Sequence, residues 1–233
     1  MRPEPPQSRL IVALDVAKQS QALSMVERIG GMAGMFKVGK QLFTAEGPAV
    51  VREIVGAGEK VFLDLKFHDI PNTVAGAVEA AASLGVSLVN VHASGGAPMM
   101  EAAARAVKGS SAQVLAVTVL TSLNAAQLQA VGFSEPPDRL VLRLARLALT
   151  CGLAGVVAAP TEVAMLRREL GSNFIILTPG IRLPGADRQD QARIATPAQA
   201  IRDGADYIVV GRPITQAADP AAAARSILQQ MIE

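Results

Sequence analysis

The chain has 233 residues, half of them hydrophobic, and a formal net charge of +2. This length and composition fit one domain with a large buried core, about the size of a single α/β barrel. Aromatic residues are scarce and the basic residues are scattered, which argues against a nucleic-acid partner. No apolar run reaches the about 20 residues of a membrane span, and the N-terminus has no apolar signal core. We therefore expect a soluble, cytoplasmic protein with no membrane partner.

The predicted elements alternate between strand and helix along the whole chain. Residues 1–8 contain three prolines and are expected to form a flexible tail. Apolar runs predict strands at 10–15, 35–39, 60–66, 87–92, 114–119, 155–158, 174–177 and 207–210. Amphipathic patterns predict helices at 18–29, 48–55, 72–84, 97–107, 124–130, 137–150, 161–170, 197–203 and from about 219, with Asn72 and Thr161 as N-caps.

Eight consecutive strand–helix units predict a single-domain (β/α)8 TIM barrel over residues 9–233. The predicted strands are continuous apolar runs, which is typical of parallel strands covered on both faces. A doubly wound open sheet is the alternative. In a barrel, the C-terminal ends of the strands form one rim, and this rim carries the chemistry. Polar residues at the predicted strand ends are therefore the candidates for a functional site.

Charged residues interrupt the apolar pattern of the third predicted strand. Asp64 and Lys66 are two residues apart and share a strand face with Phe62. Asp69 follows just after the strand, and Lys37 lies on the second strand. One interpretation is a buried salt bridge at the end of a strand. The other is a catalytic set with alternating charges, in which Asp69 would repel a substrate carboxylate and Lys66 would deliver a proton after carbon dioxide is lost.

A second group of candidates follows the seventh and eighth predicted strands. Gly211 and Arg212, with Arg182 and Gln191 from the long seventh connection, are the residue types that hold a phosphate at this place in barrels. A helix start is the alternative interpretation of Gly211 and Arg212. Thr121 follows the fifth strand, where it would either hydrogen-bond a base or sugar or cap a helix.

The remaining chemistry-bearing residues give weaker signals. Cys151 is the single cysteine, and we interpret it as a packing residue. His92 at a strand end is interpreted as structural, and His68 is expected to face away from the charged residues. There is no Cys/His cluster for zinc and no GxGxxG after the first strand, so the residues predict neither a zinc site nor a dinucleotide site.

The order of the motifs along nearly the whole chain resembles the orotidine 5'-phosphate decarboxylase family. The motifs are LDV (14–16), FKVG (36–39), FLDLKFHDIPNTV (62–74), TVLTS (118–122), TPGIR (178–182), DQ (190–191) and VVGRPI (209–214). D-x-K-x-x-D is shared with a wider suprafamily, whereas HDIPNT, TVLTS and PGIR are more specific. The resemblance implies cofactor-free decarboxylation of orotidine 5'-monophosphate to uridine 5'-monophosphate, the last step of pyrimidine synthesis.

The resemblance also implies a role for each candidate residue. Lys66 would protonate C6 of the pyrimidine between Asp64 and Asp69, while Lys37 would hold the array and the ribose. The family works as a homodimer, in which Asp69 and Thr73 would reach the partner's site. Loop 181–191 would close as a lid. The other implied contacts are Asp15 to ribose, Thr121 to the pyrimidine, and Arg182, Gln191, Gly211 and Arg212 to the phosphate.

Two alternatives to this function stay open on the sequence. A hexulose-6-phosphate synthase or a ketogulonate-phosphate decarboxylase shares D-x-K-x-x-D but needs Mg²⁺ for an enediolate. A non-catalytic barrel that binds a nucleotide or sugar phosphate would not need a lysine between two aspartates. Dependence on metal separates the first alternative, and turnover separates the second.

Overall fold

The fold is a closed barrel of eight parallel strands. The computed structural model describes residues 5–182 and 194–232. The strands pair in chain order, and β1 pairs with β8, which closes the sheet. This closure confirms the predicted TIM barrel and excludes the open doubly wound sheet. The strands are β1 (Leu10–Ala13), β2 (Met35–Gly39), β3 (Val61–Phe67), β4 (Leu88–His92), β5 (Gln113–Val117), β6 (Gly155–Val157), β7 (Ile175–Thr178) and β8 (Tyr207–Val210).

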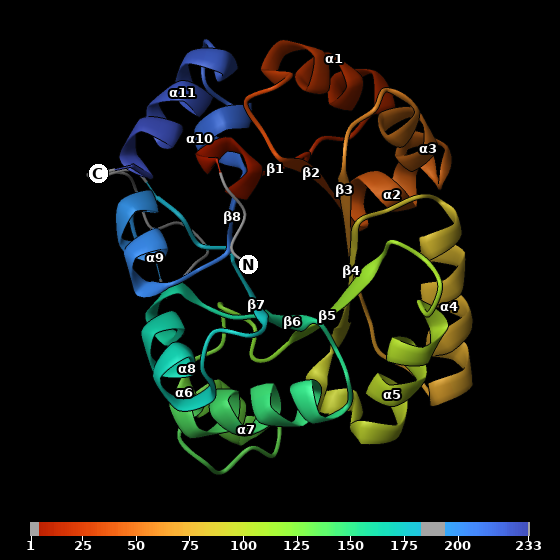
Figure 1. The fold of residues 1–233 in the computed structure, drawn as a ribbon, viewed down its shortest axis with the longest axis vertical. Coiled ribbons are helices and arrows are strands. Elements are labelled where there is room, and N and C mark those ends of the chain that lie inside the picture. Colours follow the sequence, from red (N-terminus) through yellow and green to blue (C-terminus); the bar gives the residue numbers. More distant parts are fainter. Residues whose placement is uncertain (1–4, 183–193, 233) are drawn as a thin grey trace.

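Helices surround the barrel and cover its outer face (Figure 1). The α-helices are α1 (Gln19–Ile29), α2 (Lys40–Glu46), α3 (Ala49–Gly56), α4 (Pro71–Ser83), α5 (Ala97–Ala106), α6 (Ala125–Ala130), α7 (Pro137–Thr150), α8 (Val163–Leu170), α9 (Pro197–Asp203), α10 (Arg212–Thr215) and α11 (Pro220–Gln230). Short 3-10 helices form at η1 (Pro6–Arg9), η2 (Ala93–Gly95) and η3 (Pro160–Glu162). None of the helices in residues 5–182 and 194–232 combines the length and the apolar character that a membrane crossing needs.

Side chains of each strand alternate between the barrel interior and the layer under the helices. On β3, Phe62 belongs to the interior cluster, whereas Leu63 lies in the outer core and Leu65 packs against that core. Asp64 and Lys66 are in phase with Phe62 and therefore face the interior. The predicted faces of this strand are thus confirmed, and the charged pair stands above an apolar barrel interior.

The two predicted helix caps are wrong. Helix α4 begins at Pro71, with Ile70 at the N-cap position, so Asn72 lies inside the helix. Proline fits the first helical position because its φ is preset and its missing N–H is not needed there. Thr161 lies within η3, and Glu162 is the N-cap residue of α8. Helices α2 and α10 were not expected, because each is too short for its periodicity to show in the sequence.

The start of the described chain packs against the barrel. Residues 1–4 of the expected tail lie outside the described residues. Residues Pro6–Arg9 form η1, and the Ser8 backbone lies so close to Gly34 that a Cβ on Gly34 would approach the Ser8 Cα to 2.5 Å. Only a glycine at position 34 permits this contact.

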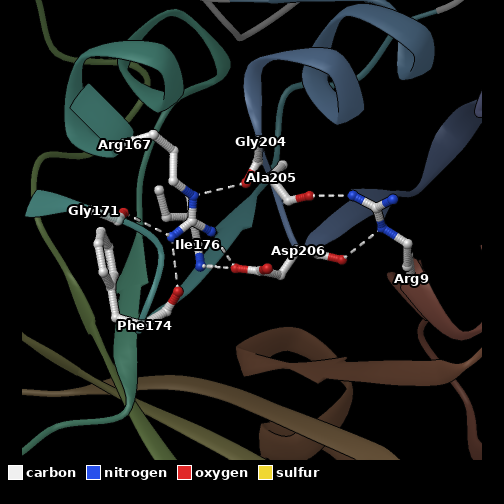
Figure 2. A network of polar contacts seen from close by, with 8 residues as sticks. All are labelled: Arg9, Arg167, Gly171, Phe174, Ile176, Gly204, Ala205 and Asp206. Carbon is white, nitrogen blue, oxygen red and sulfur yellow. Dashed lines mark hydrogen bonds and ion pairs between the residues drawn. The ribbon is translucent and has the colours of Figure 1, made fainter. Parts of the chain in front are cut away.

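A polar network ties the N-terminal ends of β7, β8 and β1 together (Figure 2). In a parallel barrel these ends lie on the side away from the C-terminal strand ends. Arg167 of α8 donates to the Gly204 carbonyl at 2.9 Å and lies 2.5 Å from the Asp206 carboxylate. The same carboxylate accepts the Ile176 backbone N–H at 2.7 Å. Arg9 donates to the Asp206 carbonyl at 3.3 Å. Because both members of the ion pair are buried and hydrogen-bonded, the network is a structural tie.

Candidate active site

A cavity of about 240 Å³ opens at the C-terminal ends of the strands. Its apolar floor includes Ala13, Phe62 and Leu177 of the barrel interior. Its polar wall brings together most of the predicted site residues from segments far apart in the chain. These are Asp15, Lys37, Asp64, Lys66, Thr121, Arg182, Gly211 and Arg212. Concave sites with an apolar base and a few convergent polar groups are typical of small-molecule binding.

Four charged side chains in this cavity form a chain of ion pairs with alternating sign. Lys37 Nζ lies 2.8 Å from Asp15 Oδ1 and 3.6 Å from Asp64 Oδ2. Lys66 Nζ lies 2.5 Å from Asp64 Oδ1. The side chains of Lys37, Asp64 and Lys66 are only 11, 12 and 24% exposed, whereas that of Asp15 is 52% exposed. Two ammonium groups and two carboxylates balance, which makes a buried charge set tolerable.

The fourth member of this array is Asp15, and Asp69 does not join it within the chain. Asp69 is exposed, its Oδ1 accepts the Ile70 backbone N–H at 2.6 Å, and it is not among the residues that line the cavity. Thr73 is likewise exposed, on α4, and away from that lining. Gln191 and most of the loop expected to act as a lid lie outside the described residues.

The backbone of Lys66 adopts an unusual conformation. Its φ is 54°, and among the described residues it is the one non-glycine residue with a positive φ. The register between β3 and β4 shifts here: Leu63 pairs with Val89, but the next pair is Phe67 with Val91. Such a bulge re-aims side chains and often lies beside an active site. It directs the Lys66 ammonium into the cavity.

Asn90 of β4 holds this bulge, although no role was predicted for it. Its Oδ1 accepts the Lys66 backbone N–H at 2.8 Å, and its Nδ2 donates to Asp64 Oδ1 at 2.7 Å. Asn90 has no exposed surface and is in phase with Leu88, which faces the barrel interior. A polar residue at an inward position of an apolar strand was the signal available in the sequence.

The array keeps Asp64 ionised. Burial alone would raise the pKa of the Asp64 carboxyl. The charges of Lys37 and Lys66, together with hydrogen bonds from Lys66 and Asn90, outweigh that effect and hold its pKa below the usual range. Asp64 therefore carries its negative charge at neutral pH, between the two lysines.

The two histidines lie beside one another at the edge of the site. The ring centroids of His68 and His92 are 5.6 Å apart. Burial, followed by the charges of His68, Lys66 and Lys40, lowers the pKa of His92 to about 4, with Asp64 opposing the shift. His92 is thus neutral at neutral pH, and its imidazole is not the charged acid that could protonate a substrate. Within the described residues, no three His, Cys, Asp or Glu side chains gather as a metal ion would need.

The cationic end of the cavity lies after β7 and β8. Arg182 is 8% exposed and donates to the Ile181 carbonyl at 2.9 Å. Gly211 is the N-cap residue of α10, and Arg212 begins that helix. A Cβ on Gly211 would lie 3.5 Å from Asp15 Oδ2, so the backbone here runs close beside the array. Two guanidinium side chains and a glycine-opened backbone suit an anion at this end.

The architecture and this constellation match a known family across almost the whole chain. The model of the Orotidine 5'-phosphate decarboxylase / HUMPS family matches residues 8–227. The chain belongs to this family. A relative from Anaeromyxobacter sp. (strain K), named Orotidine 5'-phosphate decarboxylase, is 53% identical over 222 residues, covering 95% of this chain and 97% of the relative. A relative of the same name from Moorella thermoacetica is 51% identical over 231 residues, covering 96% and 92%.

A solved structure of an orotidine 5'-phosphate decarboxylase from Lactobacillus acidophilus is similar throughout. Its TM-score is 0.87 at 37% sequence identity, with 100% of both chains covered. The resemblance and the enzyme class predicted from the motifs are therefore confirmed. The description of the family model names HUMPS beside the decarboxylase, whereas both curated relatives carry the decarboxylase name.

Proposed function

We propose that this protein decarboxylates orotidine 5'-monophosphate to uridine 5'-monophosphate in pyrimidine synthesis, without a cofactor, and that Lys66 protonates C6. The observation that carries the proposal is the Lys66 ammonium, partly buried at the cavity and paired with Asp64 at 2.5 Å. The names of the curated relatives support the substrate. Such an enzyme works in the cytoplasm, where this step of nucleotide synthesis takes place.

The proposed reaction uses the array at one end of the cavity and the cations at the other. Arg182, Gly211 and Arg212 hold the phosphate, which places the pyrimidine ring over Lys66. The bond between C6 and the carboxylate breaks, carbon dioxide leaves, and the electron pair stays on C6. Lys66 transfers one proton to C6, giving the product, and regains a proton from solvent. The ion pair with Asp64 holds the Lys66 ammonium in place for this transfer.

Binding of the substrate phosphate also contributes to catalysis in this proposal, because the reaction has a very high barrier. Enzymes that act on the slowest reactions supply on the order of 20 kcal/mol of transition-state stabilisation. The three ion pairs of the array do not provide that amount by themselves. Binding energy from the remote phosphate, held by Arg182 and Arg212, can be used to force the substrate carboxylate into the charged site. Because phosphate binding energy drives the chemical step, losing a phosphate contact should lower catalytic efficiency as well as affinity.

The proposal includes a homodimer in which Asp69 and Thr73 complete the site of the partner. Asp69 lies two residues beyond β3, close to the rim, yet is exposed and outside the lining of its own cavity. Asp69 would then supply the carboxylate that repels the substrate carboxylate.

Mixing two inactive variants tests the shared site. Lys66→Ala and Asp69→Asn protein are combined after dissociation and allowed to reassociate. If Asp69 serves the partner, each mixed dimer contains one intact site, so roughly a quarter of wild-type activity returns at equal mixing. If Asp69 serves its own chain, both sites of a mixed dimer stay defective and no activity returns.

The overall activity is tested by adding orotidine 5'-monophosphate to the purified protein in excess EDTA and following the pyrimidine absorbance. Rapid conversion to uridine 5'-monophosphate supports a metal-independent decarboxylase. No conversion, together with turnover of a sugar phosphate once Mg²⁺ is added, would assign the protein to the sugar-phosphate side of the family. Phosphate-ligand binding without any turnover would favour the non-catalytic alternative.

A further inference from the structure

Asn90 is the one described side chain that bonds both to the backbone of Lys66 and to the carboxylate of Asp64. Its amide orientation is fixed by chemistry, because the Lys66 N–H can only donate and the ionised Asp64 oxygen can only accept. Both polar ends of a fully buried amide are therefore used. Such a side chain has a single orientation, and it can hold the Lys66 backbone and the Asp64 carboxylate in fixed positions.

The bond to Lys66 replaces a missing contact between strands. The register break leaves Asp64, Leu65 and Lys66 of β3 opposite Asn90 alone on β4. The Lys66 N–H points to the Asn90 side chain at 2.8 Å instead of to a ladder carbonyl. A left-handed lysine is strained, and such a conformation persists only where its surroundings enforce it. Asn90 supplies that enforcement from the neighbouring strand.

The bond to Asp64 sets the rotation of its carboxylate. Oδ1 of Asp64 accepts from Asn90 at 2.7 Å and from Lys66 at 2.5 Å. The other oxygen is then turned toward Lys37, 3.6 Å away. The Asn90 amide thus fixes two things: the backbone conformation that sets the direction of the Lys66 side chain, and the orientation of the Asp64 carboxylate that pairs with its ammonium.

We propose that Asn90 is a positioning residue that aims the Lys66 ammonium at the reacting carbon. This inference rests on the proposed function for its kinetic consequences. Asn90 is absent from the lining of the cavity, so it acts through Lys66 and Asp64. Its loss should therefore slow the chemical step and leave binding of the substrate phosphate unchanged.

The kinetic test uses Asn90→Ala beside a matched control. Thr178→Val also removes one fully buried hydrogen-bonding side chain from a barrel strand, because the Thr178 hydroxyl donates to the Ala158 carbonyl at 3.1 Å. We expect kcat of Asn90→Ala to fall about 100-fold with KM changed less than about threefold, since small misplacements of a catalytic group cost rate. Thr178→Val should keep the wild-type kcat.

A second variant covers the case in which Asn90→Ala does not fold. Asn90→Asp keeps the size of the side chain and an acceptor for the Lys66 N–H, but its carboxylate cannot donate to Asp64. A drop in kcat at nearly constant KM is expected here too. A folded variant of either kind with kcat within about threefold of the Thr178→Val protein overturns the proposal.

A third measurement is independent of the substrate. The ¹⁵Nζ signal of Lys66, assigned by its absence in Lys66→Ala protein, reports the surroundings of the ammonium. It should shift in Asn90→Ala and stay in place in Thr178→Val. If wild-type protein does not act on orotidine 5'-monophosphate, the proposed function fails while this readout still decides the role of Asn90. An unchanged Lys66 signal in Asn90→Ala overturns that role.

Discussion

At the scale of single residues, the site depends on small groups that leave room for large charged ones. Gly39 ends β2, two residues beyond Lys37, and a Cβ on it would lie 2.8 Å from Lys37 Nζ and 3.4 Å from Asp15 Oδ1. The φ of Gly39 is −96°, which any residue adopts. The glycine is therefore needed for space rather than for backbone freedom.

We predict that Gly39→Ala lowers kcat by about tenfold or more with little loss of stability, because the Lys37 ammonium must move off its two carboxylates. Gly56→Ala in α3 is the control, since a Cβ there meets nothing within 4 Å and alanine favours a helix by about 0.5–1 kcal/mol. Steady-state kinetics and thermal unfolding of both variants check the prediction. Equal kcat values would show that Lys37 does not need its present position.

His92 gives a pH-dependent contribution to stability at the same scale. Its pKa in the folded protein is about 4, against 6.5 for the ordinary group, chiefly because of burial. The unfolded chain therefore binds a proton first as pH falls, so this contribution is complete above pH 6.5 and is lost toward pH 4. We predict a shallower fall in melting temperature over that range for His92→Asn than for wild type. Parallel curves would contradict the buried, neutral state of His92.

At the scale of elements, the proposed phosphate site lies on strand ends and a short helix. Arg212 begins α10, which follows β8 directly. We predict that Arg212→Ala lowers kcat/KM for orotidine 5'-monophosphate about 100-fold or more, roughly 3 kcal/mol of transition-state stabilisation. Arg168→Ala, at a side chain that is 68% exposed on α8, is the control and should stay near wild type. Similar kinetics for the two variants would remove Arg212 from the phosphate site.

The sequence predicted the strands well because parallel strands buried on both faces appear as continuous apolar runs. It predicted the faces of β3 because the strand period is two. It missed α2 and α10, and it did not assign Asp15 to the ion-pair array, because this pairing depends on β1 and β2 being neighbours in space. The bulge at Lys66 and the two bonds of Asn90 also follow from interstrand register, which a single strand does not encode.

At the scale of the whole molecule, the two rims of the barrel have separate tasks. The C-terminal rim holds the cavity, and the opposite rim holds the network around Arg167 and Asp206. In this fold, residues at the N-terminal face serve stability rather than chemistry. Changes at that face should therefore alter unfolding and leave turnover intact.

We predict that Arg167→Ala lowers the free energy of unfolding by about 3–5 kcal/mol, because it leaves the buried Asp206 carboxylate without its main partner. Arg143→Ala, which breaks an ion pair at a side chain that is 55% exposed, should cost at most about 1 kcal/mol. Denaturant unfolding measures both, and kcat per folded molecule should match wild type in both. A comparable loss in the two variants would contradict the structural role of the network.

The central claim is that the Lys66 ammonium supplies the proton. The most direct measurement is turnover of orotidine 5'-monophosphate by Lys66→Ala, beside Lys108→Ala at an exposed lysine after α5 and with circular dichroism to verify folding. We predict no measurable conversion by folded Lys66→Ala and wild-type conversion by Lys108→Ala. Conversion by Lys66→Ala near the wild-type rate would contradict the claim and remove Lys66 from the chemical step.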